Sequence, residues 1–264
     1  MANTHAMTQS HGMRRTMSIH NKDMPDLSFR STEKELIDDL DLDNDALRQN
    51  LEELAIINKY LGGNQVTISG LETVFNNLTT QQATYKIADL GCGGGDMLMV
   101  IAKWAKHKQI KAELIGIDAN DFMIKFATKR TVQFPEIQYL YQNIFSEEFQ
   151  QHSFDIVTMT LFCHHFDNES LIQLFKQLKQ QSRLAIVIND IHRHWFAYHS
   201  IAWITKLFLK SYLVKNDAKL SVWRAFRKSD LETIIQQAGF TNYSIKWKWA
   251  FRWEVVLFCE DNNK

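Results

Sequence analysis

YKIADLGCGGGD, residues 85–96, is the stretch of this sequence that decides the fold. Its first half is an apolar run of the kind that forms a strand buried on both faces, and residues 97–102 have the composition of a helix that packs back on that strand. The glycines between them let the backbone turn tightly and bring its N–H groups close to a ligand. The stretch therefore predicts a small-molecule cleft at the carboxyl end of a strand in an open α/β sheet.

The ligand is indicated by the residues between the glycines. A dinucleotide-binding loop needs a small residue at position 96, where this chain has Asp96, which argues against a nicotinamide cofactor. The loop instead resembles the first motif of the class I S-adenosylmethionine (SAM) methyltransferases, Asp-x-Gly-x-Gly-x-Gly, at Asp89, Gly91, Gly93 and Gly95. The resemblance covers about residues 85–260. It implies SAM as cofactor, S-adenosylhomocysteine (SAH) as product, and a Rossmann-like α/β fold whose seven-stranded sheet has helices on both faces.

Composition sets the outer limits. A chain of 264 residues with 45% hydrophobic residues can bury a full core and fits one domain with a helical extension. The formal net charge of zero gives no global attraction to nucleic acid, which we do not expect as a partner. The cysteines at 92, 163 and 259 form no close pair, so we expect neither a disulfide framework nor a zinc site, and a cytoplasmic location.

Three regions are predicted along the chain. Residues 1–25 are polar, lack periodicity and contain no apolar core of a signal peptide, which indicates a disordered tail. Residues 26–80 form a helical cap, in which a helix from Ser31 to Tyr60 begins with Glu35 in a capping box and is ended by Gly62. Residues 81–264 form the SAM-binding domain with an inserted lid at about 191–226. The resemblance implies that the cap covers the open end of the sheet.

Strands and helices alternate after the glycine loop, as in a parallel sheet with right-handed crossovers. We predict strands at 113–118, 137–141, 154–160 and 183–188, and a closing antiparallel hairpin from 243–249 and 251–259. Asp118 ends the second strand and can accept hydrogen bonds from both ribose hydroxyls. The resemblance implies that Asn143 accepts from the adenine amino group. The complete predicted cofactor set is Asp89, Gly91, Cys92, Gly93, Gly95, Asp118, Ala119, Asn143, Ile144 and Thr160.

Two polar clusters follow the fourth and fifth strands, where the methyl group is expected. His164 and His165 form the first cluster, and His165 is our predicted general base for a hydroxyl group. The alternative is that one histidine caps the helix from Asn168 while the other packs. A neighbouring pair offers no third ligand of its own, so we predict no metal.

The second cluster, residues 189–195, supplies the remaining predicted catalytic residues. His192 is the alternative base, and Asp190 is expected to orient an imidazole. Arg193 or Arg224 is expected to bind an acidic group of the substrate.

Residues 57–63, 189–195 and 221–226 resemble a narrower group of methyltransferases that act on small aromatic or polyketide-type lipids. The resemblance implies an enzyme of small-molecule biosynthesis that methylates a phenolic or lipid-like hydroxyl. A non-catalytic SAM-binding protein is one alternative, and two alternative enzymes also stay open. One is a C-methyltransferase of a quinone-type small molecule. The other is an RNA or protein methyltransferase that uses the basic region 191–252, where 11 Lys and Arg face 3 Asp and Glu.

Residues 195–210 are strongly apolar but interrupted by Lys206 and Lys210, and are too short to span the roughly 20 residues that a bilayer requires. They predict a lid over a greasy substrate or an interfacial helix in peripheral contact with a membrane. Residues 21–55 carry 11 Asp and Glu against 4 Lys and Arg. They form either a solvated face or a partner for the basic region. The oligomeric state does not follow from the sequence.

Overall fold

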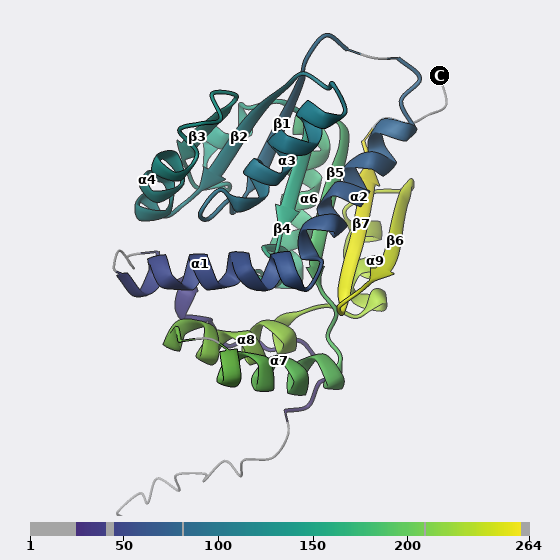
Figure 1. Cartoon of the computed structure of the whole chain (residues 1–264). Coiled ribbons are helices and arrows are strands. Elements are labelled where there is room, and N and C mark those ends of the chain that lie inside the picture. Colours follow the sequence, from purple (N-terminus) through teal and green to yellow (C-terminus); the bar gives the residue numbers. More distant parts are fainter. Residues whose placement is uncertain (1–24, 41–44, 81, 209, 260–264) are drawn as a thin grey trace, which may run out of the picture.

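The computed structural model describes residues 25–40, 45–80, 82–208 and 210–259. Within them, one seven-stranded sheet has the order β3-β2-β1-β4-β5-β7-β6 (Figure 1). The strands are β1 (Tyr85–Leu90), β2 (Ala112–Asp118), β3 (Ile137–Tyr141), β4 (Phe154–Thr160), β5 (Ser182–Ile191), β6 (Tyr243–Lys248) and β7 (Arg252–Phe258).

The five strands β1 to β5 pair in parallel, and β7 pairs antiparallel with both β5 and β6. The strand order reverses between β1 and β4, so the loops that follow these two strands diverge and leave a crevice at their carboxyl ends. The glycine loop follows β1 directly. The predicted α/β fold class and the predicted strands are confirmed, with β5 extending three residues beyond its predicted end.

Helices cover both faces of the sheet. The helices are η1 (Leu36–Asp38), α1 (Asp45–Tyr60), α2 (Gly63–Asn76), α3 (Asp96–His107), α4 (Asp121–Arg130), α5 (Glu147–Gln150), η2 (Cys163–His165), α6 (Asn168–Gln181), α7 (Trp195–Phe208), α8 (Tyr212–Arg224) and α9 (Lys228–Gln237). Apolar side chains of α2 and α3 pack on one face, and those of α5, α6 and α9 pack on the other. These two cores hold the strand ends in fixed positions.

A third group of helices lies across the carboxyl ends of the strands. In Figure 1, α1 crosses below the arrowheads of the central strands, and α7 and α8 run beneath α1. Helix α8 contacts α1, α7, η1 and η2. The predicted insertion at 191–226 therefore contains two helices that cover the open end of the sheet. None of the helices in the described ranges is both long and apolar enough to cross a membrane.

The predicted helix from Ser31 is wrong in its first half. Residues 25–40, which we call the N-terminal segment, contain only the short helix η1, and α1 begins at Asp45. The backbone N–H groups of Leu36 and Ile37 donate to the carboxylate of Asp217 on α8, at 3.0 and 3.1 Å. These long-range bonds compete with local helix formation, and tertiary context outweighs a capping-box pattern. Almost all of the predicted tail, residues 1–24, lies outside the described residues.

Candidate active site

A large cavity opens where β1, β2 and β4 end. Its volume is about 1320 Å³, above the roughly 300–1,000 Å³ typical of a site for one small molecule. The glycine loop forms one part of the wall, and the N-terminal segment, α1, α7 and α8 contribute to the rest. The cavity therefore has room for a cofactor together with a second molecule.

The glycine loop makes one wall of this cavity, and Gly91 explains why it needs glycine. Gly91 has φ +65°, and a Cβ placed there would lie 2.1 Å from the ring of Phe162. A larger residue would thus be strained in its backbone and would collide with the turn after β4. Close packing of the two loops brings the glycine loop next to the residues that follow β4.

Asp118 lies at the end of β2 and faces the same wall. Its Oδ2 accepts the N–H of Gly93 at 3.0 Å, and its Oδ1 accepts the N–H of Asn120 at 2.9 Å. A carboxylate has about four acceptor positions, so two remain for a pair of neighbouring hydroxyls such as those of a ribose. Burial raises the pKa of Asp118, while the backbone N–H bonds oppose that rise.

Asp89, at the penultimate position of β1, also lines the cavity. It is 2% exposed and accepts a hydrogen bond from Thr158 Oγ1 at 2.7 Å. Burial raises its pKa to about 7, because few groups compensate the charge. The ammonium group of an amino-acid ligand is the kind of partner that would compensate it.

The structure also places most of the remaining predicted cofactor residues in the cavity wall: Cys92, Gly93, Ala119, Asn143, Ile144 and Thr160. Gly95 is not in the wall. It precedes α3 with φ +75°, and a Cβ placed there would lie 2.2 Å from the Tyr139 hydroxyl oxygen. The Asn143 side-chain oxygen already accepts the N–H of Phe145 at 2.9 Å, and one further acceptor position remains on it.

The histidine pair sits in η2, directly after β4, and both side chains reach the cavity. His164 Nδ1 lies 2.7 Å from Asp190 Oδ1, and His165 Nδ1 lies 2.5 Å from Asp38 Oδ1. Asp190, which we expected to orient an imidazole, pairs with that of His164, and Asp38 pairs with that of His165. Neither histidine caps α6, whose cap is Asp167.

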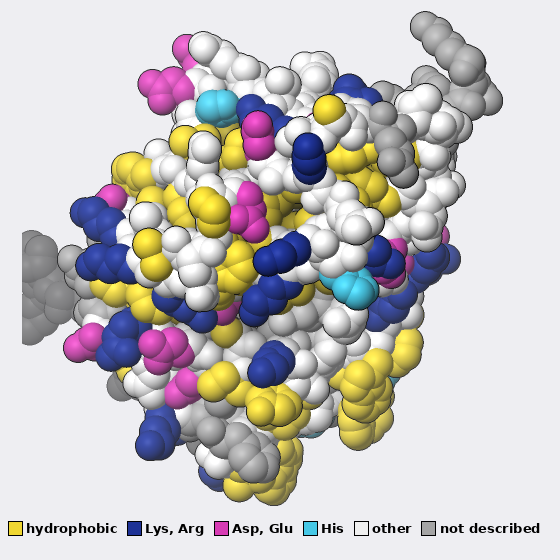
Figure 2. Space-filling view, turned by 45° about the horizontal axis from the view of Figure 1, so that its top comes forward, with side chains coloured by type: hydrophobic (Ala, Val, Ile, Leu, Met, Phe, Trp, Pro, Cys, Tyr) yellow, Lys and Arg dark blue, Asp and Glu magenta, His cyan; other side chains and the backbone are white. Residues whose placement is uncertain are grey.

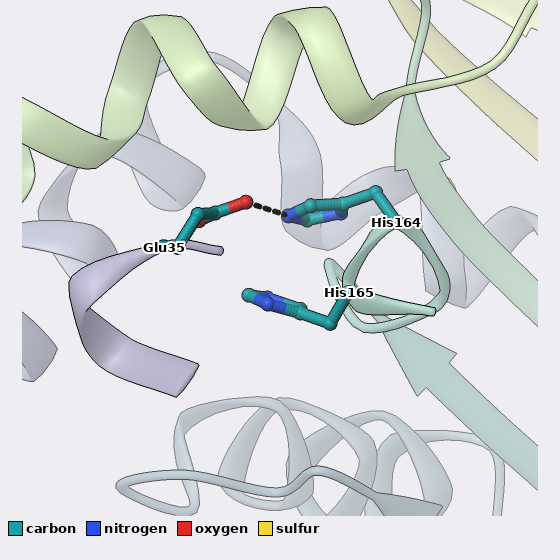
Figure 3. A group of neighbouring side chains, drawn as sticks. All are labelled: Glu35, His164 and His165. Atoms are coloured by element: carbon teal, nitrogen blue, oxygen red, sulfur yellow. Dashed lines mark ion pairs between the residues drawn. The ribbon is translucent and has the colours of Figure 1, made fainter. Parts of the chain in front are cut away.

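Asp190 is fully buried on β5. Burial by itself would raise its pKa, but the charge and hydrogen bond of His164 outweigh this and the pKa of Asp190 is lowered. The ionised Asp190 carboxylate keeps the proton of the His164 ring on Nδ1, so Nε2 is free of a proton in the neutral ring. Nε2 lies 3.6 Å from Oε1 of Glu35 (Figure 3).

Glu35 and Asp38 belong to the site and are absent from the prediction. Both come from the N-terminal segment, which the sequence pattern assigned to a helical cap. Glu35 is 4% exposed, and burial raises its pKa to about 7. The only sequence signal for them is the acidic excess of residues 21–55, interpreted as a solvated face or as a partner for the basic region. Asp38 pairs with Arg224 at 2.6 Å, which supports the second interpretation.

Arg193 and Arg224 are anchors of the N-terminal segment. Arg193 is 3% exposed and donates to the carbonyl oxygens of Leu27, Ser28 and Ala225. It also pairs with Asp230 at 3.0 Å. Arg224 donates to carbonyl oxygens of Glu33, His164 and His165. From the sequence we expected one of these arginines to bind an acidic group of the substrate. In the structure both guanidinium groups are instead bound by groups of the chain itself.

His192 does not line the cavity. Its ring lies among those of His194, Phe251 and Trp253. Its Nδ1 is buried without a hydrogen-bond partner in the described part of the chain. Burial lowers the pKa of His192 to about 4, so the ring is neutral near pH 7. The structure thus separates the two predicted bases and brings only His165 to the cavity.

The fold adds a third candidate metal ligand to the histidine pair. The sequence offers no third ligand beside the histidine pair, and the structure supplies one from 130 residues away in the chain. Glu35, His164 and His165 each present a ligand atom, and these atoms lie within 4.8 Å of one another. Figure 3 shows the Glu35 carboxylate and the two imidazole rings converging from η2 and the N-terminal segment.

Comparison with known proteins gives a consistent answer. A family model described as "Methyltransferase domain" matches residues 81–240, more than half of the chain. (S)-Coclaurine N-methyltransferase of Thalictrum flavum subsp. glaucum is 24% identical over 144 residues, which are 53% of this chain. The match covers 39% of that relative, so about two fifths of its length is represented here.

Two groups of solved structures share the fold. The plantazolicin methyltransferase BpumL, in complex with a triazolic desmethylPZN analog and SAH, has a TM-score of 0.60 and 18% identity, over 81% of this chain and 91% of that one. The CMeT domain of the citrinin polyketide synthase has a TM-score of 0.56 and 14% identity, over 75% of this chain and 52% of that one. The glycine loop, the acid at the end of β2, the strand order and the family match together show that the chain belongs to the class I SAM-dependent methyltransferases.

Proposed function

We propose that this protein transfers the methyl group of SAM to a hydroxyl oxygen of a lipophilic small molecule, of phenolic or polyketide type. The observation that carries the proposal is the His165–Asp38 pair, which faces the cavity beyond the cofactor loop. A coarser statement, methyl transfer to some small molecule, rests on the family and on the size of the cavity.

The residues of the wall fit SAM. Asp118 offers two acceptor positions for the ribose hydroxyls, and Asp89 offers a buried carboxylate for the ammonium group. When bound, SAM supplies an electrophilic methyl group on a sulfonium. The remaining tasks fall to the chain: to hold the acceptor in line with that group, to exclude water and to remove a proton. Positioning alone supplies a large part of the rate of such reactions.

His165 is suited to remove the hydroxyl proton. Asp38 Oδ1 accepts a hydrogen bond from the Nδ1–H of His165. This bond fixes the ring and keeps its proton on Nδ1, so Nε2 is the basic atom. Its side chain is 21% exposed and opens toward the cavity, whereas that of His164 is 3% exposed. Asp38 is in turn held by Arg224 at 2.6 Å. Two side chains, Asp38 and Arg224, thus orient the base.

The entrance supports a lipophilic acceptor. Four aromatic rings form a chain of contacts around the start of α7 and the β6–β7 hairpin, in the order Trp195, Phe196, Phe251 and Trp247. Phe196 and Phe251 line the cavity as well. Hydrophobic side chains gather at the lower edge of the molecule in Figure 2, on the side where Figure 1 places α7 and α8. These aromatics suit a lid over a greasy molecule or peripheral contact with a membrane.

The basic region supports a small molecule over RNA or protein. Arg193, Arg224 and Arg252 are buried, and the first two bind backbone groups of the chain itself. Lys246 and Lys248 both pair with Glu254. These five of the 11 basic side chains in 191–252 are therefore engaged by other groups of the chain, whereas a surface that tracks phosphates would need them free for phosphate.

Cys92 and Cys163 are buried free thiols, in keeping with the expected cytoplasmic location.

The test is transfer of labelled methyl from SAM in an extract of the source cells, followed by partition between organic solvent and precipitated macromolecule. Label in the organic phase supports the proposal, and label in the precipitate contradicts it. Mass spectrometry of the product then separates O-methylation from C-methylation of a quinone-type acceptor, since only the O-methyl product lacks a new carbon–carbon bond.

The residue assignment has its own test. The variant His165→Gln should lower the rate by roughly 10²–10⁴-fold, the usual contribution of a general base. SAH binding should persist, because His165 is not part of the proposed cofactor contacts. His107→Gln, an exposed histidine at the end of α3, is the control. Full turnover in His165→Gln would remove this residue from the mechanism.

A further inference from the structure

Three side chains meet in the cavity wall in an arrangement that general acid–base chemistry does not require. Glu35, His164 and His165 lie in two segments that are distant in the sequence, and their ligand atoms are within 4.8 Å of one another. In Figure 3 the two imidazole rings lie one above the other and project toward the Glu35 carboxylate. All three residues line the cavity that contains the cofactor loop.

Both imidazoles are oriented by carboxylates on the side away from the cluster. Asp190 holds His164 at Nδ1, and Asp38 holds His165 at Nδ1. This leaves Nε2 of each ring for the cluster. A histidine that binds a metal almost always donates its other N–H to a carboxylate or carbonyl, which fixes the ring and makes it a stronger ligand. Here both rings have that support.

Glu35 provides the third and most telling group. Its Oε2 accepts a hydrogen bond from Ser221 Oγ at 2.7 Å, but Oε1 is buried and has no hydrogen-bond partner within the described residues. Two ring and guanidinium nitrogens lie close to Oε1, His164 Nε2 at 3.6 Å and Arg224 Nε at 3.7 Å, and both are beyond hydrogen-bond length. A buried carboxylate oxygen without a partner is costly, and a cation would satisfy it.

We propose that Glu35, His164 and His165 bind a divalent first-row transition metal ion of the zinc type. Two imidazole nitrogens and one carboxylate oxygen are a donor set that zinc uses in catalytic sites, with a fourth position left open. Bonds of about 2.0–2.2 Å would draw the three atoms closer than they now lie. His165 can supply this movement, since its side chain is 21% exposed.

The open position faces the cavity, and the proposal gives it a task that rests on the proposed function. The hydroxyl oxygen of the acceptor binds the ion and releases its proton to water, because a bound cation lowers the pKa of that oxygen. The oxygen–carbon bond then forms as the sulfur–carbon bond of the sulfonium breaks, which leaves SAH as a neutral thioether. In the loaded protein the ion replaces His165 as the group that generates the nucleophile.

Binding can be measured without any acceptor. The full-length protein, stripped with a chelator, is titrated with Co²⁺ and its visible absorption is followed; Zn²⁺ is then added as a competitor. Native mass spectrometry gives the stoichiometry of the wild-type protein directly. We expect one ion per chain, with a tetrahedral Co²⁺ spectrum that Zn²⁺ abolishes.

Variants locate the ion. Glu35→Gln and His164→Gln remove ligands and should weaken Zn²⁺ binding by on the order of 100-fold or more, and Asp190→Asn, which removes the support of a ligand, by roughly 10–100-fold. SAH binding and circular dichroism report whether each variant is folded. His107→Gln and a variant with glutamine at positions 5, 11 and 20, which removes three histidines of the N-terminal region, are controls that should bind like wild type.

The proposal is overturned if the wild-type protein binds no stoichiometric ion, if Glu35→Gln binds as tightly as wild type, or if the variant at positions 5, 11 and 20 loses the ion. Methyl transfer that continues at full rate in the metal-free protein also overturns it, while leaving the proposed function intact. Loss of methyl transfer on chelation, restored by Zn²⁺, supports both.

Discussion

Arg224 is the residue on which the assembly of the site depends most. It is 6% exposed, and its guanidinium donates to carbonyl oxygens of His164 at 3.0 Å and of Glu33 at 2.9 Å. It also pairs with the carboxylate of Asp38 at 2.6 Å. The variant Arg224→Met keeps much of the volume but removes all of these donors. Asp38 then keeps its charge beside η2, and its contacts with the guanidinium are replaced by nothing beyond the His165 imidazole and the backbone N–H of Glu35 that it already binds.

The expected cost follows from burial. Removing one partner of a buried ion pair destabilises a protein by about 3–5 kcal/mol. The side chain of Asp38 is 19% exposed, and water can reach part of it, so we expect the lower end, about 3 kcal/mol. Adding Asp38→Asn removes the unpaired charge. The double variant should therefore be more stable than the sum of the two single losses predicts, by about 0.5–3 kcal/mol.

Urea unfolding followed by tryptophan fluorescence and circular dichroism measures these differences. The matched control is Lys228→Met, which breaks an exposed pair with Glu232 at 3.3 Å and should cost at most about 1 kcal/mol. If the loss in Arg224→Met is no larger than in Lys228→Met, Arg224 does not hold the N-terminal segment in the way that its contacts indicate.

Three further predictions concern Gly91, Asp89 and His192. Gly91→Ala should abolish SAH binding, measured by calorimetry, because of the collision with Phe162, whereas Gly62→Ala, with φ +71° and open space around it, should lose only about 1–2 kcal/mol of stability. SAH affinity should rise about tenfold from pH 6 to pH 8 as Asp89, with a pKa of about 7, ionises, and an unchanged pH profile in Asp89→Asn would contradict this. His192 has a pKa of about 4 in the folded chain against about 6.5 when unfolded, so the unfolded state binds more protons between these values and stability should fall as pH drops from about 6.5 to about 4. His192→Phe should flatten that part of the urea-unfolding profile while methyl transfer stays within a few-fold of wild type.

The cofactor half of the site could be predicted because its information is local. The strand, the glycines and the acid at the end of β2 lie within 34 residues, from Tyr85 to Asp118, and each has a backbone role that only a few residue types can perform. Gly91 shows this directly, since no side chain fits there. The same reasoning located the histidine pair, because polar residues at the carboxyl end of a central strand face the cleft.

The part of the site proposed to bind the acceptor could not be predicted, because Glu35, Asp38 and His165 are brought together only by the fold. Asp38 meets His165 across 127 positions, and the capping-box pattern around Glu35 suggested a helix that tertiary contacts replace. The sequence made His165 the first candidate base and His192 the alternative, because both follow the carboxyl end of a parallel strand. In the structure the β6–β7 hairpin lies beside the end of β5, and the His192 ring packs against Phe251 and Trp253 of this hairpin instead of lining the cavity.

The N-terminal segment has a further consequence for how such a protein can diversify. The groups proposed to hold SAM come from the sheet, while Glu35 and Asp38 come from a ribbon of chain attached to it mainly through α8 and η2. Substitutions in that ribbon can therefore change what happens to the acceptor without altering the donor pocket. A lineage could exchange one acceptor chemistry for another by substitutions within the 16 residues 25–40, while the sheet and the glycine loop stay the same.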